Sequence, residues 1–280
     1  LPAHTRVEPI SGDLLDLPAL TAAIRASRPD VVFHLAGQAY PARSWDDPAL
    51  TVAVNTGGTG NVLRAALDCG RPRIVVVTSA EIYGQISAGD LPLTEETPPR
   101  PRHPYGVSKL AAGQLARLYW ERYGLPVVEA RPFNHIGPRQ APGFVVPDFA
   151  SQLAAIRLGR KEPVIRVGNL EPQRDFTDVR DVAAAYMSLA EDGRPGEAYL
   201  ICSGRAVSVR HMLDTLIELA GVAVEVQVDE ARVNPSDTPC LYGSNDKIAA
   251  DTGWEPQIPL RQSLADALAD WERRLAATPM

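Results

Sequence analysis

No apolar run in the 280-residue sequence approaches the ~20 residues that a membrane-spanning helix needs. The first twenty residues carry acids and prolines, so they lack the basic start and apolar core of a secretory signal peptide. Cysteines are few, far apart and in no metal-ligand spacing: Cys69, Cys202 and Cys240. This usage argues against a disulfide framework and suits a reducing compartment. We therefore expect a cytoplasmic protein that does not enter a membrane.

Lysine is scarce, because only Lys109, Lys161 and Lys247 stand among the 28 basic residues. The net charge of −6 gives no reason to expect nucleic-acid binding, so an anionic substrate would need a local arginine cluster. The histidines show no metal-ligand spacing, and we predict no metal site. We interpret them as structural, with His135 alone near a pocket: His4, His34, His103, His135 and His211.

Strand-like apolar runs alternate with helix-like segments along the first two thirds of the chain. The runs carry Val and Ile without polar alternation, as in parallel strands buried on both faces: Arg6–Ile10, Asp30–Leu35, Arg73–Thr78, Pro126–Arg131 and Glu197–Ile201. The helices are expected near residues 17–27, 48–68, 104–123 and 178–191. Alternation at this spacing indicates βαβ units and a doubly wound α/β fold.

The remaining segments mix short helices, short strands and many prolines. Ser208 is placed to cap a helix whose apolar stripe contains Val209, Met212, Leu213 and Leu216. We therefore predict a smaller substrate-binding domain formed by residues 136–170 and 204–280. Residues 1–135 and 171–203 are expected to form the dinucleotide-binding domain.

Tyr105 and Lys109 lie four residues apart behind Pro104, a residue that favours the start of a helix. This spacing places both side chains on one helix face. An ammonium beside a phenol favours the phenolate, so we expect Lys109 to lower the pKa of Tyr105 and to tune it for proton exchange with a substrate oxygen. The alternative is an exposed helix pair without catalytic function.

Ser79 and Glu81 follow the apolar run Ile74–Thr78 directly. Ligands of doubly wound folds bind at the carboxyl ends of strands, where a hydroxyl stabilises charge on a substrate oxygen. Ser79 is thus a candidate for the site of Tyr105 and Lys109. The alternative is a turn in which Ser79 serves only as a cap.

These residues resemble the extended short-chain dehydrogenase/reductases, also grouped as the NAD-dependent epimerase/dehydratase family. Their catalytic Ser or Thr, Tyr and Lys match Ser79, Tyr105 and Lys109, and Tyr83-Gly84 follows at the usual distance. Further matches are the turn Gly12-Asp13-Leu14, the strand Phe33–Ala36 and the helix of Asn55 and Gly58-Thr59. The resemblance implies a Rossmann-like sheet that binds NADP or NAD. The cofactor residues that it implies are Asp13, Leu14, Leu35, Ala36, Asn55, Tyr105, Lys109 and Pro132.

The substrate half resembles one branch of this family, the bacterial GDP-6-deoxy-D-mannose reductases. The similar segments are Arg131–Pro138, Gly143–Ala150, Val167–Leu170 and Arg174–Asp181. The resemblance implies reduction of the C4 keto group of a GDP-4-keto-6-deoxyhexose, with substrate contacts from Asn134, Val145, Arg174 and Arg232. Arginine suits a diphosphate because it offers bidentate cationic donors. The alternative for Arg174 is an ion pair with Asp175 or Asp178, and we also expect residues Phe144–Val146 to clamp the base.

Family members pair through two helices, which implies a homodimer through the helices near 48–68 and 104–123. Apolar residues of these helices exceed what one sheet face needs, among them Val62, Leu63, Leu115 and Leu118.

The chain departs from the family pattern at three places. It begins at Leu1 rather than methionine, and the family's first βαβ element with its Gly-rich turn has no counterpart, which indicates a fragment, a processed form or an incompletely determined chain. That element also separates NAD from NADP. Asn234 stands where reductases often have arginine before Pro-Ser-Asp, and Arg232 is a candidate substitute. Glu81 occupies the place of a dehydratase acid, so a 4,6-dehydratase or epimerase stays an alternative, as does a non-catalytic nucleotide-sugar-binding protein.

Overall fold

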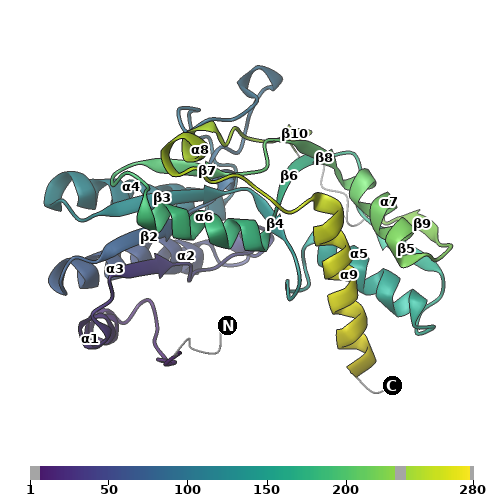
Figure 1. Cartoon of the computed structure of the whole chain (residues 1–280), viewed down its shortest axis with the longest axis horizontal. Coiled ribbons are helices and arrows are strands. Elements are labelled where there is room, and N and C mark those ends of the chain that lie inside the picture. The colour runs from purple at the N-terminus through teal and green to yellow at the C-terminus, as the bar shows by residue number, and fades with distance from the viewer. Residues whose placement is uncertain (1–6, 231–237, 278–280) are drawn as a thin grey trace.

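The computed structural model describes residues 7–230 and 238–277 and confirms the α/β class. Its first sheet contains four parallel strands in the order β1-β2-β3-β7. These strands coincide with four of the five predicted runs: β1 (Val31–His34), β2 (Arg73–Val77), β3 (Val127–Pro132) and β7 (Ala198–Ile201). Figure 1 shows this sheet between layers of helices.

Successive residues along β2 point to opposite faces of this sheet. Ile74 and Val76 pack with residues of α3 (Gly58–Asp68) and α4 (Pro104–Tyr123) in one buried cluster. Val75 packs in another cluster with residues of α6 (Val179–Glu191), and Ile248 of α8 (Asp246–Thr252) belongs to the same cluster. Helix α1 (Leu17–Ser27) packs on α3. The uniformly apolar strands are therefore buried on both faces, as the sequence predicts.

The predicted first strand, Arg6–Ile10, is wrong for the residues that the structure describes. Residues 7–10 have no regular secondary structure, and Val7 and Ile10 are 62% and 64% exposed. A strand forms only beside a partner backbone, and within residues 7–230 and 238–277 β1 is an edge strand that pairs with β2 alone.

A second, smaller set of strands continues from the end of β3. It has the order β10-β6-β4, with β8 antiparallel to β6: β4 (Asn134–Ile136), β6 (Gln173–Asp178), β8 (Ala206–Ser208) and β10 (Cys240–Leu241). A separate pair is formed by β5 (Val164–Val167) and β9 (Glu225–Val228). Strand β6 thus lies outside the first sheet, whereas α6, which follows it directly, packs on that sheet.

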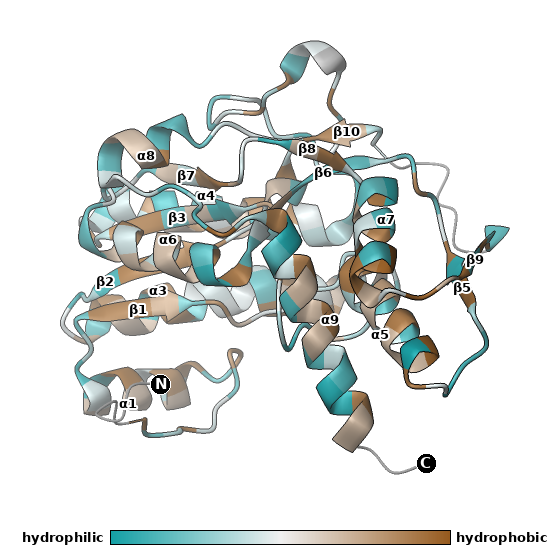
Figure 2. Cartoon of the chain, turned by 45° about the vertical axis from the view of Figure 1, so that its right-hand side comes forward, coloured by the Kyte–Doolittle hydropathy of each residue, from teal (hydrophilic) through white to brown (hydrophobic). Residues whose placement is uncertain are grey.

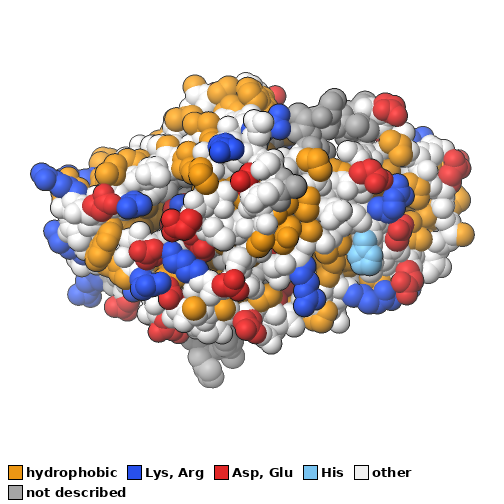
Figure 3. All heavy atoms as spheres, turned by 90° about the horizontal axis from the view of Figure 1, so that it is seen from above, with side chains coloured by type: hydrophobic (Ala, Val, Ile, Leu, Met, Phe, Trp, Pro, Cys, Tyr) orange, Lys and Arg blue, Asp and Glu red, His pale blue; other side chains and the backbone are white. Residues whose placement is uncertain are grey.

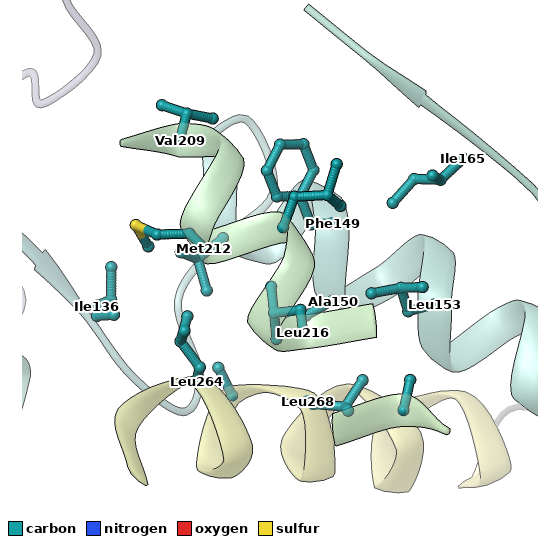
Figure 4. Packing of buried hydrophobic residues seen from close by; sticks show 14 of the residues in the cluster. Ile136, Phe149, Ala150, Leu153, Ile165, Val209, Met212, Leu216, Leu264 and Leu268 are labelled. Atoms are coloured by element: carbon teal, nitrogen blue, oxygen red, sulfur yellow. The ribbon is translucent and has the colours of Figure 1, made fainter. Parts of the chain in front are cut away.

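Three helices enclose a core of their own beside β5: α5 (Val145–Arg157), α7 (Val209–Ala220) and α9 (Leu260–Ala277). Figures 1 and 2 show them apart from the four-stranded sheet, and Figure 4 shows their apolar side chains converging. The predicted stripe of α7 lies in this core, with Met212, Leu213 and Leu216 fully buried. Ser208 caps α7 as predicted, because its Oγ accepts from the N–H of His211 at 3.1 Å.

None of the described helices is long and apolar enough to cross a membrane.

The face seen in Figure 3 intermingles acidic and basic side chains with apolar ones.

His34, at the end of β1, is buried and bonded to Thr59 at 2.9 Å. The Thr59 hydroxyl donates to the Asn55 carbonyl, so it accepts from Nε2–H of a neutral His34. Burial, assisted by the charge of Lys109, lowers the pKa of His34 to about 4. As the pH falls, His34 is therefore protonated near pH 6.5 in the unfolded chain but only near pH 4 in the folded protein.

We predict that this histidine makes the fold acid-labile. Between pH 6.5 and about 4 the unfolded state holds more protons than the folded state, so the free energy of unfolding should fall by about 3 kcal/mol on account of His34. Urea unfolding at a series of pH values should show that the free energy of unfolding depends less steeply on pH in His34→Asn than in the wild type. The exposed His211→Asn should keep the wild-type slope, and an equally steep slope in His34→Asn would contradict the assignment.

Candidate active site

Tyr105 and Lys109 lie in the first turns of α4, as predicted. The helix begins at Pro104, and His103 caps it by accepting from the N–H of Gly106 at 3.0 Å. Tyr105 and Lys109 are only 8% and 7% exposed, which rules out the exposed helix pair. The ammonium of Lys109 lies 5.9 Å from the centre of the Tyr105 ring and donates to the Val77 carbonyl at 2.9 Å.

Ser79 meets this pair from the end of β2. Its side chain interacts with that of Tyr105 and acts to lower the pKa of the phenol, and its hydroxyl accepts from the N–H of Glu81 at 3.2 Å, which begins the 3₁₀ turn η3 (Ala80–Ile82). Ser79 is thus both a turn cap and a partner of Tyr105, so the two interpretations do not exclude each other. The structure brings the three predicted catalytic side chains together at the carboxyl end of the first sheet.

The expected lowering of the Tyr105 pKa is wrong for this arrangement. Burial raises the pKa of Tyr105 to about 12, although the bond with Ser79 acts in the opposite direction. Burial also lowers the pKa of Lys109 to about 8. The penalty for withdrawing a phenolate from water exceeds the opposing effect of Ser79. Tyr105 is therefore protonated at neutral pH.

Asn55 supports this site through a local change of helix type. The helix begins as α2 (Pro48–Val52), widens to a π-helix (η2, Ala53–Gly57) and continues as α3. The amide of Asn55 donates to Ser108 Oγ at 2.9 Å, and its Oδ1 accepts from the N–H of Gln38 at 2.8 Å. Asn55 thereby joins α4 to the loop behind β1, and π-bulges often accompany such functional positions.

The residues expected to hold the cofactor lie around the ends of β1 and β3. Leu35 and Ala36 follow β1 and are exposed, with Leu35 at 55%, and Pro132 ends β3. The turn of Asp13 and Leu14 is attached to α3, because Asn61 donates to the Leu14 carbonyl at 2.9 Å. An exposed leucine at a strand end offers the apolar contact that part of a dinucleotide needs. Their roles stay predictions.

The predicted substrate residues occupy the second set of strands. Asn134 is exposed at the start of β4, and Val145 begins α5. Arg174, on β6, donates to the carbonyl oxygens of Gln173 and Thr238 at 2.9 and 2.6 Å. Arg232 and Asn234 lie outside the described residues.

The carboxylates that were alternatives for Arg174 have other partners. Asp175 accepts from Ser203 Oγ at 2.7 Å, and Asp178 forms an ion pair with Arg180 at 2.8 Å.

The apolar clamp expected from Phe144 to Val146 cannot include Val146. Val146 is fully buried in the core of α5, α7 and α9, where no ligand reaches it. The Phe144 ring stacks on Tyr40 at a centroid distance of 5.1 Å. Phe144 therefore joins the loop after β1 to the start of α5.

His103 is the functional neighbour that the sequence interpretation missed. Because Nδ1 accepts from Gly106, its proton lies on Nε2, which donates to Glu81 Oε2 at 3.0 Å. The His103 ring lies 5.9 Å from the ring of Tyr105. Its place directly before Pro104 was the available signal.

Comparison with known proteins agrees with this geometry. A family model described as GDP-mannose 4,6 dehydratase matches residues 2–267. The GDP-6-deoxy-D-mannose reductase of Pseudomonas aeruginosa is 40% identical over 88% of this chain and 82% of that protein. The GDP-mannose 4,6-dehydratase of Sinorhizobium fredii is 29% identical over 89% of this chain and 76% of that protein.

Solved structures are similar over almost the whole chain. RMD from Pseudomonas aeruginosa complexed with NADPH has a TM-score of 0.92 and 38% identity, covering 98% of this chain and 92% of that one. A UDP-glucose 4-epimerase from Thermotoga maritima has a TM-score of 0.87 and 25% identity, covering 98% and 89%. These matches confirm the Rossmann-like fold and the predicted resemblance.

The close packing of Gly37 against Asn55 predicts that alanine substitutions at Gly37 and Gly57 will differ in their effect on stability. A Cβ at Gly37 would lie 2.7 Å from Asn55 Oδ1, whereas one at Gly57 would meet nothing within 4 Å. Gly37→Ala should therefore cost about 1–3 kcal/mol of stability and displace Asn55, while Gly57→Ala should resemble the wild type. Calorimetric melting and turnover of both variants measure this, and equal behaviour of the two would refute the tight contact.

Proposed function

The chain belongs to the GDP-mannose 4,6-dehydratase family of extended short-chain dehydrogenase/reductases, and we propose that it reduces the C4 keto group of a GDP-4-keto-6-deoxyhexose to a GDP-6-deoxy-D-mannose (rhamnose) product. The observation that carries this proposal is the buried group of Ser79, Tyr105 and Lys109, in which Tyr105 is held protonated. The similarity to a reductase over 88% of the chain supports the choice of substrate.

In the proposed reaction Ser79 donates a hydrogen bond to the C4 carbonyl oxygen, and Tyr105 gives its phenolic proton to that oxygen as it becomes an alkoxide. The chemistry that bound NADPH or NADH supplies is hydride transfer to C4. The Lys109 ammonium lies beside the Tyr105 ring. From this position Lys109 would bind a hydroxyl of the cofactor ribose. Asp13, Leu14, Leu35, Ala36, Asn55 and Pro132 would hold the cofactor.

The sugar nucleotide would occupy the region between the two sets of strands. Asn134 donates amide hydrogen bonds from the start of β4, Val145 offers apolar contact, and Arg174 and Arg232 neutralise the diphosphate. All three cysteines are free thiols. Because free thiols are typical of a reducing compartment, we propose that the reaction takes place in the cytoplasm.

A second candidate function is supported by Glu81. Its carboxylate lies two residues after Ser79 and is bonded to His103, beside Tyr105. A carboxylate here would serve the elimination of water by a 4,6-dehydratase. An epimerase on the same fold is the related alternative, and both reactions would regenerate bound NAD within each turnover. Net consumption of NADPH separates reduction from both of these reactions. A non-catalytic binding protein is disfavoured, because binding alone needs no buried Ser-Tyr-Lys group.

We predict that Tyr105→Phe retains the fold but loses turnover by about 10²–10⁴-fold, because the ring packing remains while the acidic proton is gone. The assay follows the loss of NADPH absorbance in the full-length protein, with a GDP-4-keto-6-deoxyhexose as substrate. The wild type should consume one NADPH per product. Wild-type turnover in Tyr105→Phe would reject the catalytic assignment, and conversion of GDP-mannose to a 4-keto-6-deoxy product without net NADPH consumption would favour the Glu81 alternative.

We further propose a homodimer built through α2, α3 and α4. Two residues that suggested this interface, Val62 and Leu63, are instead buried within the chain at 5% and 0% exposure. Exposed apolar side chains nevertheless remain on α2 and α4: Leu50, Val52, Val107, Leu118 and Tyr123. Pairing two copies through these helices would bury these side chains in a four-helix bundle.

The expected result of Leu118→Arg is therefore a monomer, since a charge would be placed in the helix interface. Light scattering at micromolar concentration should give twice the mass of a single chain for the wild type and one chain mass for the variant. Leu158→Arg is the matched control, because Leu158 is similarly exposed (40%) but follows α5. A monomeric wild type would contradict the proposed assembly.

A further inference from the structure

The turn that carries Ser79 and Glu81 is held at both ends by one ion pair on β3. This pair is formed by Glu129 and Arg131, two residues apart, through Arg131 Nε to Oε1 at 3.0 Å and Nη2 to Oε2 at 2.9 Å. Neither residue belongs to the predicted catalytic or binding set. Their side chains are 10% and 13% exposed.

Thr78 attaches the first end of the turn. Its Oγ1 donates to Glu129 Oε1 at 2.7 Å, and its N–H donates to the Ala130 carbonyl at 2.8 Å. Thr78 is 2% exposed and directly precedes Ser79. The direction in which the chain leaves β2 is thus fixed by a charge-assisted hydrogen bond, which is stronger and shorter than one between neutral groups.

Tyr83 attaches the other end. Its hydroxyl accepts from Arg131 Nη1 at 3.0 Å, and its side chain is fully buried. The guanidinium also lies 5.9 Å from the centre of the Tyr83 ring. The 3₁₀ turn between Thr78 and Tyr83 is therefore fixed from both sides by partners that bind each other.

Glu129 also touches the helix that carries Tyr105. A Cβ at Gly113 of α4 would clash with Glu129 Oε1, so the helix approaches the carboxylate as closely as a glycine allows. The same ion pair thus contacts the turn of Ser79 and the helix of Tyr105. It also lines a polar cavity of about 420 Å³ between α4 and β7, which keeps part of the pair near water.

We propose that Glu129 and Arg131 are positioning residues that set the Ser79 hydroxyl against Tyr105. A buried ion pair is weak evidence of stabilisation, because desolvation of both charges offsets their attraction. Fixing a catalytic turn is a better account of this pair, since a displacement of about 1 Å at a reacting group can cost about 10²-fold in rate. The proposal rests on the proposed function only in taking Ser79 and Tyr105 as the reacting pair.

The test uses two substitutions at Thr78. Thr78→Val keeps the shape but removes the hydroxyl that binds Glu129, and Thr78→Ser restores it. We expect kcat to fall about 10- to 100-fold in Thr78→Val with KM changed less than about twofold, and to recover in Thr78→Ser. Arg131→Met, which frees Tyr83, should show the same split between kcat and KM.

A double-mutant cycle separates positioning from general stability. If Thr78 acts through Ser79, Thr78→Val should cause little further loss in a Ser79→Ala background. Full additivity there, or wild-type kcat in Thr78→Val, would overturn the proposal. Glu121→Gln is the matched control, because Glu121 forms an exposed ion pair with Arg117 on α4 and should leave kcat unchanged. Wild-type turnover of Ser79→Ala alone would instead reject the proposed function, which distinguishes the two failures.

Discussion

The hydrogen bond from Lys109 Nζ to the Val77 carbonyl is the interaction on which the site depends. It joins the helix of Tyr105 to the strand that precedes Ser79, and it satisfies a carbonyl at a strand end where a helix or ligand must supply the donor. A buried ammonium without such an acceptor would be costly. Asn55 and Ser108 complete the attachment from the other side of α4. Because these bonds connect three separate segments, the catalytic group exists only in the folded protein.

Elements marked by strong local signals were predictable from the sequence. Helix α4 has the expected bounds because Pro104 starts it and Gly124, in a left-handed conformation at φ 64°, ends it. The π-helix at Asn55 was not predictable, since it depends on bonds to Gln38 and Ser108, 17 and 53 residues away. The contact of His103 with Glu81 and the stacking of Phe144 on Tyr40 are likewise tertiary. Residue type and spacing identify the members of the site, whereas their partners follow from packing.

The pKa values of Tyr105 and Lys109 likewise depend on packing that the sequence does not reveal. Spacing correctly placed a lysine beside a tyrosine, but it could not reveal how deeply both are buried. Burial acts on each group alone and opposes its charged form, so it raises the pKa of Tyr105 and lowers that of Lys109. Charge and spacing alone therefore do not predict the direction of the Tyr105 pKa shift.

The state of Tyr105 bears on the direction of the reaction. A reductase needs a proton donor at the substrate oxygen, and a phenol whose pKa is about 12 is protonated throughout the neutral range. A dehydratase begins with oxidation at the same carbon, for which Tyr105 would first have to lose that proton. It would also need Glu81 as a base or acid, yet one carboxylate oxygen already accepts from the His103 N–H. Reduction can therefore start from the protonated Tyr105 of this arrangement, whereas elimination also requires Glu81 to act while it accepts from the His103 N–H.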